Sequence, residues 1–181
     1  MITRLTQTYY NQSDWDTNAM FAGIQEYSSF NTISHFVYNL GDEVLPNGAI
    51  RTIEGTGNVF EHGTIDARSL PLGTSRILKP FGLATRLTDI DIICRNPAFY
   101  VECGDGPGHR VEDIRIDDDY DGASTGMIEI SATGSTFKDI VQPRGAFHFA
   151  STASNNAVIG HSRPAAVDDD GTNNTVSLAE T

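Results

Sequence analysis

The sequence predicts an all-β fold, a short parallel β-solenoid in which successive turns of the chain stack on one another. A short pattern recurs as LTDIDI at 87–92, VEDIRI at 111–116 and FKDI at 137–140, with a weaker copy, FEHGTI, at 60–65. The first apolar residues of the copies are 27, 24 and 26 residues apart, and Gly, Asn and Asp separate the copies. Repeats of this length with strand-type alternation are typical of solenoids, because one turn cannot bury its apolar face alone.

Length, composition and charge limit the classes of function. A chain of 181 residues with 39% apolar residues suits a single domain. The formal net charge of −12 disfavours binding to nucleic acid, whose phosphates are neutralised by Lys and Arg, and binding to anionic membranes. Residues 1–8 lack the apolar core of a signal peptide, so we expect a protein made in a cytoplasm. Cys94 and Cys103 are then expected to be free thiols inside the coil.

The first residues predict a segment that precedes the regular turns. Residues 1–12, rich in Thr, Tyr and Gln, are expected to form an extended N-terminal arm. Ser13 or Asp14 can cap a short amphipathic helix over 15–27, where apolar residues recur at helical spacing. An arm and a helix are therefore predicted before the first long strand.

Strands are predicted from there onwards. The runs 36–40 and 49–53 indicate two entry strands, so that 13–54 holds the helix with these strands and 55–181 holds the turns of the coil. An antiparallel sandwich, which also has short strands at regular spacing, is the alternative fold. Each turn offers a second strand, and alternation places its bulky residues on one face: Phe99 and Val101, Ile128 and Ile130, and Phe147 and Phe149.

Two segments near the start of the chain have a recognisable form. The segment DTNAMFAGIQ at 16–25 is similar to an Asp-Thr-x-Ala helix, and VLPNGAIR at 44–51 is similar to a strand with a Leu-Pro-x-Gly turn. Together they resemble the start of the pectate-lyase-like, right-handed parallel β-helices found in phage tailspikes and related trimeric phage structural proteins. The resemblance implies a tailspike-like, right-handed parallel β-helix and a helix that caps one open end of the coil. It also implies a homotrimer.

These features lead us to expect a virion component, a capsid cement or decoration protein that stabilises the phage shell as a trimer. The chain is shorter than the enzymes and tailspikes of this type and shows no nucleophile motif, so we expect neither an enzyme nor a cofactor. The expected partners are further copies of the chain and the major capsid protein at the capsid surface, where trimers fit threefold positions. Four aromatic residues are candidates for the interface, although burial of the helix on the coil explains them equally: Tyr9, Tyr10, Trp15 and Phe21.

One register position of the repeat carries a polar ladder, formed by His62, Asp89, Asp113 and Asp139. Stacked carboxylates about 5 Å apart could act as a general acid and base for glycoside cleavage, or could bind a cation. The interpretation that we favour is a ladder of turn residues whose side chains bond nearby backbone N–H groups. Three cations lie close enough in sequence to compensate the charge: Arg86, Arg110 and Lys138.

The alternative function follows from the other interpretation of the ladder. A phage tailspike or tail protein would bind or cleave host surface polysaccharide along a groove. It would use the three aspartates of the ladder, or the aromatic residues Tyr100 and Tyr120, as contacts for sugar rings.

The segment DDDYDG at 117–122 has the Asp-x-Asp-x-Asp-Gly form of a calcium loop, which leaves a calcium-dependent adhesin as a third function. Ile128 stands where such a loop has its bidentate Glu, so we expect a solvated acidic loop and no metal site. His148 lies between two phenylalanines and is expected to point outward or into a trimer interface. The five histidines show no metal-ligand spacing: His35, His62, His109, His148 and His161.

Overall fold

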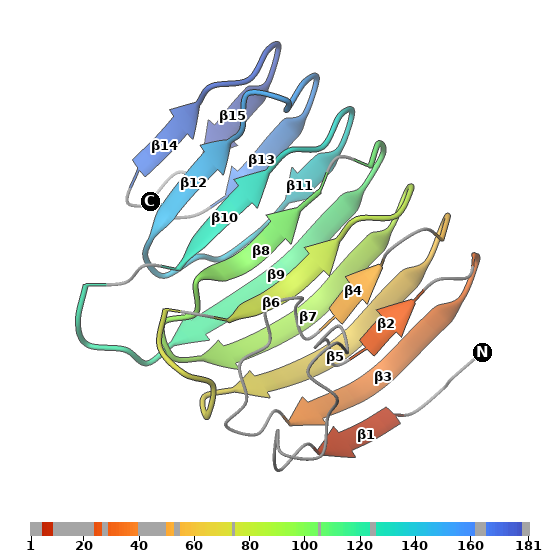
Figure 1. Cartoon of the computed structure of the whole chain (residues 1–181), viewed down its shortest axis with the longest axis vertical. Coiled ribbons are helices and arrows are strands. Elements are labelled where there is room, and N and C mark those ends of the chain that lie inside the picture. Colours follow the sequence, from red (N-terminus) through yellow and green to blue (C-terminus); the bar gives the residue numbers. More distant parts are fainter. Residues whose placement is uncertain are drawn as a thin grey trace, which may run out of the picture.

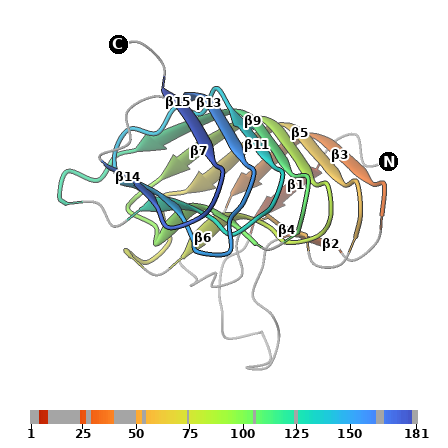
Figure 2. The same cartoon turned by 90° about the horizontal axis from the view of Figure 1, so that it is seen from above.

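The chain forms a parallel β-solenoid. The computed structural model describes residues 5–8, 24–26, 29–39, 50–52, 55–73, 75–104, 106–123, 126–161 and 166–178. The regular secondary structure of these described residues consists of strands alone. The strands form an eight-stranded and a seven-stranded sheet. Figure 1 shows both sheets running along the long axis of the molecule, and Figure 2 shows them facing each other across the interior.

The strand order follows the chain, with the two sheets taking alternate strands. The eight-stranded sheet contains, in order, β1 (Leu5–Thr8), β3 (Thr32–Asn39), β5 (Val59–Ala67), β7 (Arg86–Cys94), β9 (Arg110–Asp118), β11 (Thr136–Lys138), β13 (Ala157–His161) and β15 (Thr175–Leu178). The seven-stranded sheet contains β2 (Ile24–Glu26), β4 (Ile50–Thr52), β6 (Arg76–Pro80), β8 (Phe99–Cys103), β10 (Met127–Ile130), β12 (Ala146–Phe149) and β14 (Ala166–Asp169).

All strand pairs are parallel, which confirms the predicted solenoid and excludes the antiparallel sandwich. The register follows the sequence repeat, because Leu87 pairs with Phe60 on one side and with Val111 on the other. Phe137 pairs with Val111 and with Val158 on the next strands. All five side chains are buried, so the first apolar residue of each repeat forms a continuous column in the core.

A left-handed residue in each turn explains the form of the repeat. Asp89 has a φ of 51° and Asp113 has a φ of 55°, the region in which Asp, Asn and His are enriched among residues other than Gly. This residue shifts the phase of alternation, so that Leu87 and Ile90 both point into the core although they are three residues apart. The complete column of left-handed residues is His35, His62, Asp89, Asp113, Asp139 and Gly160.

Polar side chains stack inside one corner of the coil and bond the backbone of the preceding turn. The N–H of His109 donates to Ser135 Oγ at 2.9 Å, and the N–H of Ser135 donates to Asn156 Oδ1 at 2.9 Å. The N–H of Asn156 donates in turn to Asn174 Oδ1 at 3.1 Å. These bonds satisfy buried backbone groups at a corner where a side chain without an acceptor would leave them unpaired.

The entry segment differs in part from the prediction. The predicted helix over 15–27 is wrong at its C-terminal end, because Ile24–Glu26 form β2 and pair with β4; residues 9–23 lie outside the described part of the chain. Sheet pairing overrides the helical spacing of the apolar residues at this point. Within the predicted arm, residues Leu5–Thr8 form a strand of the eight-stranded sheet and pair with β3, and the other arm residues lie outside the described part of the chain. The two predicted entry strands correspond to β3 and β4.

Candidate functional site

The aspartates of the predicted ladder lie on the outside of the eight-stranded sheet, where cations or histidine accompany two of them. His62 Nδ1 lies 2.7 Å from Asp89 Oδ2, and Arg115 lies 3.9 Å from the other oxygen of the same carboxylate. Lys138 lies 3.4 Å from Asp139. Lys138 therefore compensates the ladder as predicted, whereas the arginine beside Asp89 is Arg115, which the sequence did not single out.

Of the other two cations expected at the ladder, Arg86 has a different partner. Arg86 lies 3.7 Å from Glu112, one residue away from the ladder on the neighbouring strand. The predicted turn ladder needs correction, because His62, Asp89 and Asp113 lie within strands β5, β7 and β9 and not in turns. The printed partners of the ladder carboxylates are charged side chains or histidine, and what the members share is the left-handed backbone conformation. Asp and His tolerate the left-handed backbone conformation better than most residues other than Gly. Their presence at this position therefore needs no catalytic or metal-binding role.

A shallow depression lies next to the ladder, over strands β5, β7 and β9. Its volume is about 320 Å³, and its lining includes Thr64, Asp91, Ile93, Arg115 and Asp117. Two of these lining residues form an ion pair, with Arg115 Nη1 3.2 Å from Asp91 Oδ1. The depression therefore offers one cation, two carboxylates and an aliphatic side chain on an open surface, which is the kind of lining that hydroxyl-rich ligands can contact.

The acidic loop contains one structural carboxylate that the calcium pattern does not include. Asp118 is buried, and its Oδ1 accepts hydrogen bonds from the N–H of Asn96 at 3.0 Å and the N–H of Tyr120 at 3.1 Å. Its Oδ2 accepts a hydrogen bond from the Tyr100 hydroxyl at 2.5 Å. The alternation of β9 that turns Asp118 inward turns Asp117 and the following acids outward.

This arrangement removes Tyr100 from the list of sugar-binding candidates, because its side chain is fully buried in the core. It also agrees with the expected solvated loop, since Asp117, Asp119 and Asp121 are all exposed. Asp119 lies 4.0 Å from Arg95. In the described residues these three carboxylates do not form a convergent set of ligands.

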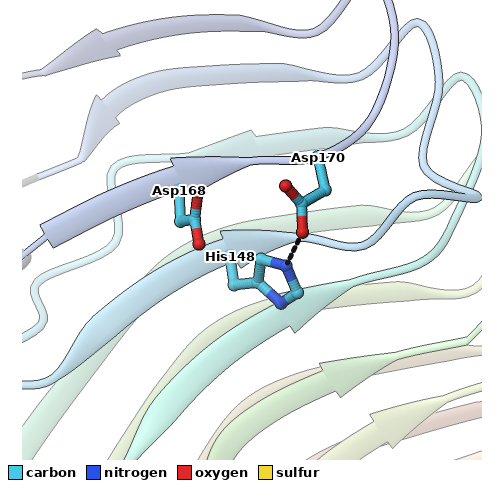
Figure 3. Close-up of side chains that lie close together, drawn as sticks. All are labelled: His148, Asp168 and Asp170. Carbon is cyan, nitrogen blue, oxygen red and sulfur yellow. Dashed lines mark ion pairs between the residues drawn. The ribbon is translucent and has the colours of Figure 1, made fainter.

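A different cluster does converge, at the last turn of the seven-stranded sheet. His148 lies on β12, its register partner Asp168 lies on β14, and Asp170 directly follows β14 (Figure 3). One ligand atom from each of the three residues lies within 4.8 Å of the other two. His148 Nε2 is 3.5 Å from Asp170 Oδ2, and His148 Nδ1 is 3.3 Å from Glu129 Oε2 on β10.

Local structure explains why two of three consecutive aspartates face this cluster. Asp169 Oδ1 accepts hydrogen bonds from the N–H of Gly171 at 2.9 Å and from Asn174 Nδ2 at 3.0 Å. These bonds engage the middle carboxylate in the turn that follows β14. Strand alternation then places Asp168 and Asp170 on the outer face, beside the His148 ring.

Two other histidines are buried in the core and are not available as surface ligands. Burial lowers the pKa of His161 to about 4 and the pKa of His109 to about 4. Gln142 Nε2 donates to the carbonyl oxygen of Arg144 at 2.8 Å, which leaves Gln142 Oε1 to accept from His161 Nε2 at 2.9 Å. The hydrogen-bond pattern therefore places a proton on Nε2, and burial disfavours a second proton on Nδ1.

The cysteines are free and buried, as the sequence predicts. Burial raises the pKa of the Cys94 thiol, so this side chain belongs to the core and is not a nucleophile at neutral pH. The four aromatic residues predicted for an interface, Tyr9, Tyr10, Trp15 and Phe21, lie outside the described residues.

Comparison with protein-family models, with curated proteins and with solved structures finds no match. None of the described residues belongs to a helix of the length and apolarity needed to cross a membrane. The functional interpretation therefore depends on the fold, the exposed surfaces and the side-chain clusters of this chain.

The sequence analysis did not identify the cluster at the last turn. The orientation of His148 was predicted correctly, since it is half-buried on the outer side of its strand. The three ligand candidates are separated by 20 and 2 residues, which matches no short metal-binding motif. The register of the strands could have revealed the cluster. An aspartate at the register position of an outward-facing histidine, on the next strand of the same sheet, lies beside that histidine.

Proposed function

We propose that the chain is a structural protein of a virion, a capsid cement or decoration protein that works as a homotrimer by packing against its own copies and against the major capsid protein. The observation that carries the proposal is the exposure of apolar side chains in the last turn of the coil that the structure describes. Val167 and Leu178 continue the interior columns of the two sheets, yet their side chains are 41% and 47% exposed. Solenoids need their end turns covered, because each turn buries its apolar face only against a neighbour.

The backbone of the last turn supports the same conclusion. Among the described residues, β14 and β15 each have a strand partner on one side only. An open strand edge with apolar side chains beside it is a surface that proteins normally cover or pair. A second chain that covers it would bury these side chains at about 25 cal/mol per Å² of apolar area.

The threefold symmetry of the proposed trimer and the negative charge of the chain are both compatible with a role in a viral shell. Identical subunits related by a threefold axis present three copies of one contact surface, so that modest contacts add through multivalency. The net charge of −12 keeps separate trimers soluble and favours a basic partner surface. In this proposal the work of the protein is mechanical, because it adds buried surface between shell subunits.

Two measurements test the proposal. Light scattering after size exclusion should give the mass of a trimer, and Val167→Asp and Leu178→Asp should shift the mass toward that of the monomer while circular dichroism stays that of a β-protein. The matched control is Val37→Asp, at an exposed valine on β3 near the opposite end of the coil. A wild-type monomer at all concentrations, or equal effects of the three variants, contradicts the trimer.

The second measurement is the copy number of the chain in purified particles of its virus, by quantitative mass spectrometry against the major capsid protein. Hundreds of copies in simple proportion to the shell protein are expected for a cement protein. A handful of copies would overturn that role and would favour the tail.

The depression around Arg115 favours a second candidate function, a tail protein that binds host polysaccharide. Asp91 and Arg115 are held at 3.2 Å and can offer both acceptor and donor groups to sugar hydroxyls. Arg115→Ala should then weaken binding on an array of host-surface polysaccharides. The matched control is Arg95→Ala, at an exposed arginine near the acidic loop. Absence of binding and of released reducing ends would exclude this function.

A further inference from the structure

We propose that His148, Asp168 and Asp170 form a binding site for a divalent transition-metal ion such as Zn²⁺, and that the ion fastens the last strand of the seven-stranded sheet to its neighbour. The inference is independent of the proposed role in a virion. It depends on the geometry of three side chains, on the orientation of the imidazole and on the chemistry of the donor set.

The three donors already lie close to the arrangement that a metal ion needs. Their ligand atoms lie within 4.8 Å of one another. Around Zn²⁺, with bonds of about 2.0–2.2 Å, neighbouring ligand atoms lie roughly 3–3.5 Å apart. Rotations of exposed carboxylates can close this gap, because Asp168 and Asp170 are both exposed and lie on the outer surface of the coil. The strands need not move.

The imidazole has the orientation of a metal ligand with a supporting carboxylate. His148 Nδ1 faces Glu129 Oε2 at 3.3 Å, while His148 Nε2 faces Asp170 at 3.5 Å. When Nδ1–H donates to Glu129, the lone pair of Nε2 is left on the side where Asp170 lies. A carboxylate on the far nitrogen is the usual way in which proteins fix the tautomer and raise the basicity of a metal-binding histidine.

The position in the fold keeps this orientation in place. Glu129, His148 and Asp168 occupy the same register position on three successive strands, β10, β12 and β14. The supporting carboxylate, the imidazole and the first ligand carboxylate therefore form a row across the sheet, and Asp170 approaches from the turn after β14. Ligands on paired strands are positioned by the sheet, which is more precise than positioning by a loop.

The donor set selects the class of ion. One imidazole nitrogen with two carboxylates suits Zn²⁺, Co²⁺, Ni²⁺ or Mn²⁺, whereas Ca²⁺ and Mg²⁺ prefer sites built from oxygen alone. The two ligand carboxylates balance the charge of a divalent ion, and Glu129 adds a third negative charge in the outer sphere. Three protein ligands leave a coordination position for water or for a donor from another molecule.

The competing explanation is a simple ion pair, in which protonated His148 lies between Glu129 and Asp170. The two explanations differ in what stabilises the last turn. An ion pair on the surface contributes about 0–1 kcal/mol and needs no metal. A metal ion that binds only the folded chain raises the melting temperature in proportion to the logarithm of its concentration.

The test uses the full chain, dialysed against EDTA and then freed of the chelator. Isothermal titration with ZnCl₂ should show one site per chain, and Zn²⁺ should raise the melting temperature, whereas CaCl₂ and MgCl₂ should do neither. His148→Gln, Asp168→Asn and Asp170→Asn should each remove this site or weaken it at least tenfold. Glu129→Gln should weaken it about 10–100-fold without removing it, because Glu129 is a positioning residue.

The matched control is His62→Gln, at the exposed histidine that pairs with Asp89 on the other sheet. This variant should leave Zn²⁺ binding unchanged, as should Asp119→Asn in the acidic loop. Absence of Zn²⁺ binding to a folded chain overturns the proposal, and so does binding that survives Asp168→Asn and Asp170→Asn together. Loss of binding in His62→Gln would place the ion elsewhere and would also overturn it.

Discussion

The ring of Phe36 fills the space above Gly63 that a side chain would otherwise occupy. The two residues pair directly on β3 and β5, and a Cβ atom built on Gly63 would overlap the ring. In the next turns the same register position carries Ile90 and then Ile114. The large and the small residue therefore share the volume that two isoleucines fill further along the coil.

Gly63→Ala should consequently destabilise the protein by about 1–3 kcal/mol, because the added methyl group must displace a packed ring. Combining it with Phe36→Leu should recover part of this loss, which gives a coupling energy above about 0.5 kcal/mol in a double-mutant cycle. Urea unfolding monitored by circular dichroism measures all four proteins. Thr64→Ala, at the neighbouring residue, is the control and should change stability little; additive effects of Gly63→Ala and Phe36→Leu would contradict the shared volume.

The left-handed column makes a prediction about Asp113. Asp113→Asn should be tolerated, since Asn also adopts this conformation readily, whereas Asp113→Val should cost about 1–2 kcal/mol of folding free energy. Thermal unfolding measures both variants. If Asp113 instead served as a general acid or base, Asp113→Asn would abolish polysaccharide cleavage while leaving stability unchanged. Detecting such a cleavage activity and its loss would overturn the structural role.

The buried histidines predict how stability depends on pH. Burial lowers the pKa of His109 and of His161 from 6.5 to about 4, so between these values the unfolded chain binds protons that the folded chain does not. The contribution of the two histidines to the free energy of unfolding is complete above about pH 6.5, decreases as the pH falls, and is lost below about pH 4. Each histidine contributes on the order of 3 kcal/mol to this dependence. Urea unfolding between pH 4 and 8 measures it.

The matched variants for this prediction are His161→Gln and His35→Gln. His161→Gln removes a buried ring and should flatten the profile, even if it lowers the overall stability. His35 is exposed, so His35→Gln should leave the shape of the profile unchanged. Equal slopes for the wild-type chain and His161→Gln would show that another group causes the acid sensitivity.

The bond between Tyr100 and Asp118 predicts a stabilising role for the acidic segment. Tyr100→Phe removes the hydroxyl that donates to the buried carboxylate and should cost about 1–3 kcal/mol. Asp118→Ala should cost more, because it also leaves the N–H groups of Asn96 and Tyr120 without their acceptor. Asp121→Ala, at an exposed aspartate in the same segment, is the control. Equal stability of all three variants would contradict this role.

The fold could be predicted from the sequence because each turn of the solenoid places the same kinds of residue at the same positions. Leu87 and Val111 occupy equivalent places in equivalent turns, so their similarity is visible without an alignment of other proteins. The entry segment could not be predicted as well. Residues Ile24–Glu26 lie in a pattern that suits an amphipathic helix, and only their pairing with β4 makes them a strand.

The candidate sites were harder to predict for a related reason. The ladder of His62 and the aspartates is visible in the sequence because it lies within the repeat. The cluster of His148, Asp168 and Asp170 arises where the repeat becomes irregular, and its members come together through the register of β12 and β14. Asp118 was overlooked because five of the six residues in its segment are acidic or polar, and alternation alone decides which of them is buried.

The two series of left-handed residues in the coil have a consequence for how it can vary. A second series lies five residues before the first: Phe30, Gly57, Ala84, Gly108, Gly134 and Asn155; Asn173 extends it into the last described turn, where Leu178 is not left-handed. From Phe30 to Asn155 the distance from each of these to the next is 27, 27, 24, 26 and 21 residues, yet the separation between the two series stays at five. All differences in turn length are therefore confined to the remainder of the circumference. The protein has one side of constant outline and another that can lengthen, shorten or receive a grafted peptide while the stacking of the turns remains the same.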